Sequence, residues 1–262
     1  CFSYGFPCIH KVPCCDRTVL HHICVLWLFM DMEQNFRHNQ GMEKRGRDIE
    51  REEFLMKLSV IIPVYNEKTT ITEILKQVID VPVDKEIIIV DDSSTDGTRE
   101  ILKNIRRTHK DIRLILKEKN EGKGSAVREG LKHIAGDIVV IQDGDLEYNP
   151  MDWIRMLQVI KDKGADVVYG SRILGKGEKS SLTFYLGGRL LSFLVNILYG
   201  ANITDEPTCY KMFKVDVIRS IKLDCKGFEF CPEVTAKVLK KGYKIYEIPI
   251  SYKPRKIKEG KK

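Results

Sequence analysis

The sequence predicts an α/β domain in which a mostly parallel, wound sheet carries helices on both faces. Short apolar runs rich in Val and Ile alternate with longer amphipathic segments between residues 56 and 170. This alternation is typical of strands joined by crossover helices. Some of the runs are continuously apolar, as in strands that are buried on both faces. Acidic and polar side chains follow three of the runs directly.

The predicted elements follow one another regularly from residue 56. Strands are expected where β-branched residues cluster, and helices where apolar residues recur at helical spacing. The predicted strands are residues 58–62, 86–90, 113–117, 137–142 and 165–170, and the predicted helices between them are residues 69–79, 97–107, 124–134 and 151–161.

After residue 171 the pattern changes to a long, mostly apolar helix over residues 182–199. Its polar residues Arg189, Ser192 and Asn196 are spaced three and four apart, so they share one face. Two interpretations fit this composition: a helix fully buried in the domain, or a helix that binds lipid or a membrane surface. A further helix is predicted at residues 228–240.

Two carboxylates, Asp143 and Asp145, follow the run 137–142 with only Gly144 between them. In open α/β sheets, ligands bind beyond the carboxyl ends of the strands. Mg²⁺ commonly takes one or two protein carboxylates and completes its shell with water and substrate phosphates. The pair therefore predicts a divalent metal on a phosphorylated small molecule, and the alternative is a solvated acidic turn.

Two other strand ends carry similar signals. The run 86–90 leads into Asp91 and Asp92, followed by the small polar residues 93–98. Capping of the next helix accounts for some of these side chains, but two adjacent acids at the strand end favour a ligand role for Asp92. The run 58–62 leads into Tyr65 and Glu67, which places a ring and a carboxylate at the same edge.

Five motifs occur in a fixed order: PVYNE at 63–67, VDDSSTDGT at 90–98, NEGKGSAVREG at 120–130, QDGDLEYNP at 142–150 and GSR at 170–172. Together they resemble the family 2 glycosyltransferases of the GT-A fold, within the branch of dolichyl-phosphate mannose synthase and polyprenyl-phosphate glycosyltransferases. The resemblance runs from about Met56 to the last residue, and it implies a Rossmann-like wound sheet.

The resemblance implies transfer of a sugar from a nucleoside diphosphate sugar, with Mg²⁺ or Mn²⁺ on the diphosphate. Asp143, Asp145 and Glu147 correspond to the metal site. The catalytic set would be Asp143, Asp145, Arg172, Glu229 and Glu233. The implied nucleotide-sugar site comprises Pro63, Tyr65, Glu67, Val90, Asp92, Lys123, Gly144, Glu147, Arg189, Arg255 and Lys261, of which Arg189, Arg255 and Lys261 would contact phosphates together with Arg172.

The chain departs from the family pattern at two positions. Gly144 stands where relatives commonly have Ala, which loosens the turn without removing a ligand. Cys231 stands where relatives often have an acid, which puts a catalytic role for that position in doubt.

The expected acceptor is a polyprenyl phosphate, and the expected transfer inverts the sugar's configuration. The acceptor oxygen is already an anion near neutral pH, so no general base is required. With a hydroxyl acceptor, such as a glycan, a base would be needed, and Glu229 or Glu233 would be the candidates. A third alternative is a non-catalytic module that binds sugar nucleotides.

Composition supports one domain with a substantial core, since 43% of the 262 residues are hydrophobic. Much of the net charge of +7 lies in the basic C-terminal segment 253–262. This segment either faces anionic phosphates or lipid headgroups, or is a solvated terminus. It lacks the interleaved aromatics that nucleic-acid binding would favour. We expect a cytoplasmic protein that is peripheral at the inner face of the membrane.

Residues 1–55 differ from the rest of the chain, with five of the eight cysteines and one short apolar run. We expect a poorly ordered or non-native extension before a domain at 56–262, which ends within a basic segment that continues in relatives, as a truncated form would. The alternatives are a cleaved signal peptide, which lacks a cleavage site, and a Cys/His metal knuckle, which lacks paired C-x-x-C spacing. Cys209, Cys225 and Cys231 are scattered, which favours a reducing compartment.

A chain that begins at Met56 should fold as well as the full chain, because nothing before the first strand has a core-forming pattern. Its thermal unfolding, followed by circular dichroism, should be cooperative and have a midpoint within a few degrees of that of the full chain. A broad transition without cooperativity would show that residues 1–55 belong to the domain.

Overall fold

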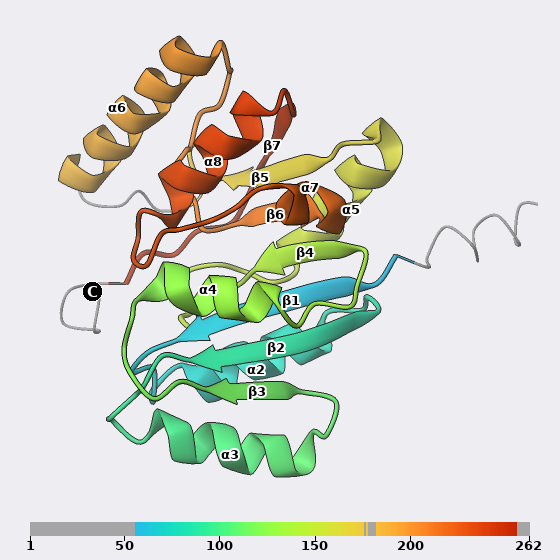
Figure 1. The fold of residues 1–262 in the computed structure, drawn as a ribbon, viewed down its shortest axis with the longest axis vertical. Helices are drawn as coiled ribbons and strands as arrows, with labels where there is room; N and C mark the ends of the chain where they lie inside the picture. Colours follow the sequence, from blue (N-terminus) through green and yellow to red (C-terminus); the bar gives the residue numbers. More distant parts are fainter. Residues whose placement is uncertain (1–55, 176, 178–181, 256–262) are drawn as a thin grey trace, which may run out of the picture. The chain divides into compact units, whose positions relative to one another are not determined.

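In the computed structural model, the described part of the chain comprises residues 56–175, 177 and 182–255 (Figure 1). The predictions for residues 1–55 and for Lys261 lie outside this part. A seven-stranded sheet forms its centre, in the order β3-β2-β1-β4-β6-β5-β7. The strands are β1 (Leu58–Val64), β2 (Lys85–Asp91), β3 (Arg113–Leu116), β4 (Ile138–Ile141), β5 (Val167–Ser171), β6 (Lys211–Lys214) and β7 (Ile245–Pro249).

The sheet is parallel except at β6. β1 pairs in parallel with β2 and β4, β2 with β3, and β5 with β7, whereas β6 is antiparallel to both β4 and β5. The mostly parallel wound sheet is therefore confirmed, and so are the five predicted strands. β6 and β7 were not predicted from the sequence. β6 holds the second half of the sheet to the first.

The helices are α2 (Ile71–Asp80), α3 (Thr98–Thr108), α4 (Lys123–Leu131), α5 (Asp152–Lys163), α6 (Leu182–Tyr199), α7 (Val215–Ser220) and α8 (Phe230–Lys240). They form two layers. Buried residues of α2, α3 and α5 belong to one apolar cluster, and those of α4, α7 and α8 belong to a second cluster on the other face of the sheet. In Figure 1, α4 and α8 lie in front of the sheet and α2 lies behind it.

The continuous apolar runs are explained by these two layers. Along β1, Val60 and Ile62 point into the first cluster, whereas Ile61 points into the second, and all three are fully buried. A strand with helices on both faces has no solvent-facing side, so alternation is lost.

The path of the chain leaves a crevice at the carboxyl ends of the central strands. From β1 the chain proceeds to β2 on one side, and after β3 it returns to β4 on the other side of β1. This reversal is the topological switch point where open α/β sheets bind ligands. The polar segments after β1, β2 and β4 all reach this edge.

Helix α6 exposes its apolar side chains, so the interpretation of a fully buried helix was wrong. Phe193 and Leu198 are 58% and 71% exposed, and only 11% of the helix is buried. The polar residues instead face the domain: Ser192 is buried and accepts a hydrogen bond from the Glu206 amide, and Asn196 bonds to both backbone groups of Ile203. By length and composition alone, α6 could also cross a membrane.

Gly130→Ala should destabilise the fold, because a Cβ at this position would meet Ile61 Cγ2 at 2.6 Å inside the second cluster. Overpacking of this kind costs about 1–3 kcal/mol, which exceeds the gain in helix propensity from replacing Gly. Gly187→Ala in α6 is the matched control, since a Cβ there meets nothing within 4 Å. The free energy of unfolding, measured with urea, should be clearly lower for Gly130→Ala than for the parent protein, and equal or higher for Gly187→Ala.

Candidate active site at the carboxyl edge of the sheet

A pocket of about 430 Å³ lies at this edge, between the segments that follow β1, β2 and β4. It brings together most of the residues expected to bind the nucleotide sugar. These are Pro63, Tyr65, Glu67, Asp92, Lys123, Gly144, Glu147 and Arg255, and the pocket also contains the metal-ligand candidates Asp143 and Asp145.

The first metal-ligand candidate, Asp143, is ion-paired with Lys123. Lys123 is the first residue of α4, and its Nζ also donates to Cys209 Sγ at 3.0 Å. Although burial alone would lower the pKa of Lys123, the Asp143 carboxylate raises it well above its ordinary value. Burial would likewise raise the pKa of Asp143, but Lys123 lowers it. The pair is therefore charged at neutral pH.

The second candidate, Asp145, follows β4. It lies beside Arg255, which belongs to the segment after β7. Arg255 forms a two-pronged contact with Glu67, at 2.9 and 3.1 Å, and donates to Asp145 Oδ2 at 3.0 Å. Thr70 adds a hydrogen bond to Glu67. One guanidinium thus joins the end of β1 to the turn after β4. Planar, bidentate recognition of this kind is specific to Arg.

The carboxylates of this pocket lack sufficient compensating charge. Burial, and then the neighbouring Asp143, raise the pKa of Asp145 to about 7, although Arg255 opposes this shift. A divalent cation between the two side chains would relieve the repulsion, and carboxylate oxygens are the donors that Mg²⁺ prefers. The donor set therefore fits the expected metal at Asp143 and Asp145. Among the described residues, however, no group of three or more His, Cys, Asp and Glu side chains is arranged to hold an ion.

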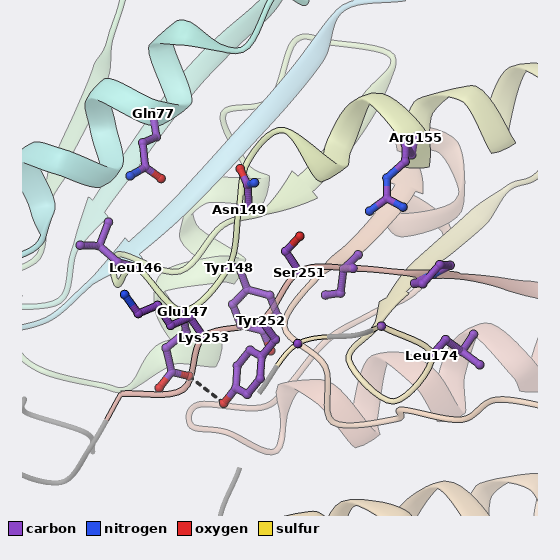
Figure 2. Close-up of a pocket in the computed structure, with 14 residues that line it drawn as sticks. Gln77, Leu146, Glu147, Tyr148, Asn149, Arg155, Leu174, Ser251, Tyr252 and Lys253 are labelled. Carbon is purple, nitrogen blue, oxygen red and sulfur yellow. Dashed lines mark hydrogen bonds between the residues drawn. The ribbon is translucent and has the colours of Figure 1, made fainter. Parts of the chain in front are cut away.

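Glu147, the third predicted metal ligand, forms part of a wall between pockets. Its oxygens accept hydrogen bonds from the Arg255 amide at 2.7 Å and from the Tyr252 hydroxyl at 3.1 Å. Figure 2 shows the contact with Tyr252 beside another pocket of about 690 Å³, whose lining includes neither Asp143 nor Asp145. Both oxygens are engaged in positioning the segment after β7.

Asp92 shapes the floor of the pocket through the loop before α4. Its carboxylate accepts hydrogen bonds from Lys117 Nζ at 2.6 Å, from the Gly122 amide at 2.6 Å and from the Glu121 amide. The side chain is buried but still lines the pocket. Val90, in contrast, lies in the core of the sheet and is not part of the lining.

Comparison with known proteins decides the family. Residues 59–222 match the profile of Glycosyl transferase family 2. The chain belongs to glycosyl transferase family 2. The matched region begins within β1 and includes β2 to β6, and it contains every residue of the candidate site described so far except Arg255 and Tyr252.

Two relatives of the chain are named as mannosyltransferases of lipid phosphates. The chain is 29% identical over 79% of its length to the dolichol-phosphate mannosyltransferase of Pyrococcus furiosus, and 27% identical over 79% to the undecaprenyl-phosphate mannosyltransferase of Micrococcus luteus. It is 28% identical to the low-salt glycan biosynthesis hexosyltransferase Agl6 of Haloferax volcanii over 76% of its length. It covers 59%, 87% and 48% of the three relatives in that order, so it spans little more than half of the first.

Solved structures support the fold. Glucosyl-3-phosphoglycerate synthase from Mycobacterium tuberculosis, in complex with Mn²⁺, uridine diphosphate and phosphoglyceric acid, matches with a TM-score of 0.61 at 19% identity, over 78% of this chain and 73% of that chain. A complex of the same enzyme with Mg²⁺ and uridine diphosphate has a TM-score of 0.59 at 19% identity, over 81% and 76%.

Two further arginines expected to contact phosphates, Arg172 and Arg189, do not line the pocket that contains Asp143 and Asp145. Arg172, at the end of β5, donates three hydrogen bonds of 2.7–2.8 Å to Asp205 and lies over the Tyr252 ring at 5.2 Å. It lines a neighbouring pocket of about 590 Å³. Arg189 in α6 is exposed and donates to the Thr204 carbonyl.

The structure gives Glu229 and Glu233 local structural contacts. Glu229 accepts hydrogen bonds from the amides of Lys226 and Gly227. Glu233 accepts from the amides of residues 224 and 225 and pairs with Lys237. Burial opposes its ionisation, but these bonds lower the pKa of Glu233 to about 2. Neither carboxylate lines the pocket of the metal candidates.

Several lining or supporting residues were not predicted from the sequence. Lys117 ends the predicted strand 113–117, so the rule that ligands gather at strand ends could have identified it. Cys209 and Phe228 line the pocket, and Asp205 orients Arg172, but these residues lie after the predicted alternation and carry no comparable signal.

Asp145→Asn should stabilise the metal-free protein at high pH. A folded-state pKa of about 7 exceeds the ordinary value of 3.8, so the unfolded state binds fewer protons between these values and stability falls as pH rises through this range. In chelator, we expect the variant to be more stable than the parent by about 4 kcal/mol at pH 8, since each unit of pKa difference corresponds to about 1.4 kcal/mol, and the difference to be small near pH 4. Chemical unfolding at both pH values measures this.

Mn²⁺ provides the complementary readout, because an ion that binds only the folded state raises its melting temperature. At pH 8 it should do so for the parent and not for Asp145→Asn. A variant that is less stable than the parent at pH 8 would mean that the pairing with Arg255 outweighs the repulsion from Asp143.

Proposed function

We propose that this protein is an inverting glycosyltransferase that moves a sugar from a nucleoside diphosphate sugar to a polyprenyl phosphate. The observation that carries this proposal is the adjacency of two pockets. The pocket of the metal candidates and the pocket of Arg172 share Glu147 and Phe228 in their linings. A donor in the first and an acceptor in the second would meet at these two side chains.

The first pocket suits the donor. The Tyr65 ring is partly exposed in the lining and offers a face for a base, and Asp92 lies in the same lining. Mg²⁺ or Mn²⁺ held by Asp143 and Asp145 would neutralise charge that develops on the leaving diphosphate. Lys123 and Arg255 lie within hydrogen-bonding distance of these carboxylates, so they are placed to bind the diphosphate as well.

The second pocket suits an apolar chain with an anionic head. Phe184, Tyr185 and Leu191 of α6 line it together with Phe228, and Arg172 supplies a cation next to Glu147. Apolar lining with a few placed polar groups is typical of sites for small molecules. A phosphate beside Arg172 would have its chain directed along α6.

A phosphate acceptor also explains why no free base is needed. The lining of the donor pocket includes no histidine, and each carboxylate in it accepts at least one hydrogen bond or forms an ion pair. A phosphate oxygen is already deprotonated at neutral pH. Direct attack on the sugar then inverts its configuration.

The exposed apolar face of α6 supports attachment to a membrane surface. Contiguous exposed apolar side chains commonly mark membrane or protein contacts, and a polyprenyl chain would be presented there. The three cysteines of the described residues are free thiols. They fit a peripheral protein at the cytoplasmic face, since disulfides persist mainly in oxidising compartments.

Transfer should be abolished by Asp145→Asn while the fold is retained. The assay incubates the full chain with a panel of nucleotide sugars, a short-chain polyprenyl phosphate and Mn²⁺, and follows radiolabel into lipid. Asp166→Asn is the matched control, because Asp166 forms a surface ion pair with Lys214 at the opposite ends of the strands. Turnover that survives in Asp145→Asn, or in excess chelator, would remove the metal from the proposal.

Membrane attachment is tested by Leu190→Gln combined with Phe193→Gln, two exposed positions of α6. Loss of two buried apolar side chains should weaken flotation with vesicles by at least about tenfold, with nucleotide binding unchanged. Met151→Gln, which replaces an exposed apolar residue outside α6, should float like the parent. Equal flotation of all three proteins would show that α6 does not attach the protein to the membrane.

A further inference from the structure

Two thiols meet beneath the donor pocket, from segments that are distant in the sequence. Cys209 lies just before β6 and lines the pocket. Cys231 lies in the first turn of α8. Cys231 Sγ lies 3.7 Å from the carbonyl oxygen of Thr208, the residue before Cys209, and both cysteines are free thiols.

The pair is connected directly to the group that holds the first metal-ligand candidate. Lys123 Nζ donates to Cys209 Sγ at 3.0 Å and is ion-paired with Asp143. Cys231 contacts the same segment from the other side, since its Sγ lies 3.7 Å from the Thr208 carbonyl oxygen. A change of bonding at Cys209 therefore acts on Lys123 without an intermediary.

The surroundings favour reactivity of Cys231. The hydrogen bond from Cys209 lowers the pKa of Cys231 to about 7, with further contributions from Lys211 and Lys123, although burial opposes the shift. Thiolates, not thiols, are the nucleophiles in cysteine oxidation. A low-pKa cysteine next to a second thiol is the arrangement found in reversible redox sites.

We propose that Cys209 and Cys231 form a reversible disulfide that weakens donor binding. With a peroxide as oxidant, the Cys231 thiolate attacks one peroxide oxygen and becomes a sulfenic acid while the other oxygen leaves as water. The Cys209 thiol then displaces the sulfenic hydroxyl as a second water, so that two thiols and one hydrogen peroxide give one disulfide and two waters. A dithiol reverses the reaction by exchange.

The disulfide changes the setting of Lys123. Closing the two sulfurs to about 2.05 Å draws Cys209 Sγ toward α8, and the hydrogen bond from Lys123 is lost. The Lys123–Asp143 pair then loses its support at the point where the donor diphosphate would bind. This consequence rests on the proposed function, whereas the disulfide itself does not.

The test treats the full chain with hydrogen peroxide and then measures two quantities. Mass spectrometry of a non-reducing digest should find a peptide that links Cys209 to Cys231. Binding of Mn²⁺ and uridine or guanosine diphosphate, measured by calorimetry, should weaken about tenfold, as expected for the loss of one charge-assisted hydrogen bond. Dithiothreitol should restore it.

Two variants provide the controls. Cys231→Ser should bind nucleotide like the reduced parent and lose the response to peroxide. Cys225→Ser should respond like the parent, because the Cys225 thiol is hydrogen-bonded to Glu233 and not to the pair.

Absence of the linked peptide, or an equal loss of binding in Cys231→Ser, would overturn the proposal. A linked peptide with unchanged nucleotide binding would show that the disulfide forms but does not weaken donor binding, which would overturn that part of the proposal. If the reduced parent bound no nucleotide at all, the donor site of the proposed function would fail, while the linked peptide would still test the thiol pair.

Discussion

The structure depends on the pairing of Arg255 with Glu67 and Asp145. Five carboxylates line one pocket at the carboxyl edge of the sheet, and each would repel the others if it were left without a cation. Arg255 is ion-paired with two of them, which share its single positive charge, and Lys123 is ion-paired with a third. Because Arg255 follows β7 and Glu67 follows β1, the contact also joins the last described segment of the chain to the first strand. The charge that a ligand must meet is thus the same charge that holds the edge together.

This arrangement implies exchange of partners during binding. A divalent ion at Asp143 and Asp145 would take over the role of the two cations, which would then be available to the diphosphate. These ion pairs are strong because they are buried in a medium of low dielectric constant. If the metal ion replaces Lys123 and Arg255 as the partner of the carboxylates while the two cations pair with the diphosphate, no buried charge is left without a partner. An unpaired buried charge would be costly. Glu147 lines the pocket of the metal candidates and both neighbouring pockets. An exchange of ion pairs would therefore affect the neighbouring pockets through Glu147 and its hydrogen-bond partner Tyr252.

The sequence was informative where short-range patterns determine structure. The β-branched runs predicted β1 to β5, and the acids after β4 predicted a pocket that the topology places at the switch point. β7 was not predicted because Glu247 interrupts its apolar residues, so that Ile245–Pro249 forms neither a continuous apolar run nor a regular alternation. The contacts of Glu229 with the loop before α8, and of Arg172 with Asp205, depend on side-chain geometry between segments that are far apart in sequence. No local periodicity encodes such contacts. The composition of α6 was compatible with either burial or exposure, and only the three-dimensional contacts of Ser192 and Asn196 distinguish the two.

The polarity of α6 reverses the usual relation between position and mutational tolerance. On most helices the inward positions accept only apolar residues and the outward positions accept almost anything polar. Here the inward positions at Ser192 and Asn196 make specific hydrogen bonds with Glu206 and Ile203, so an apolar substitution would leave buried backbone groups without partners. If α6 lies against a membrane surface as proposed, the outward positions need only remain apolar and are free to exchange Leu, Ile, Phe and Met. Among homologous sequences, selection on this helix would therefore conserve identity on the polar side and only hydrophobicity on the other.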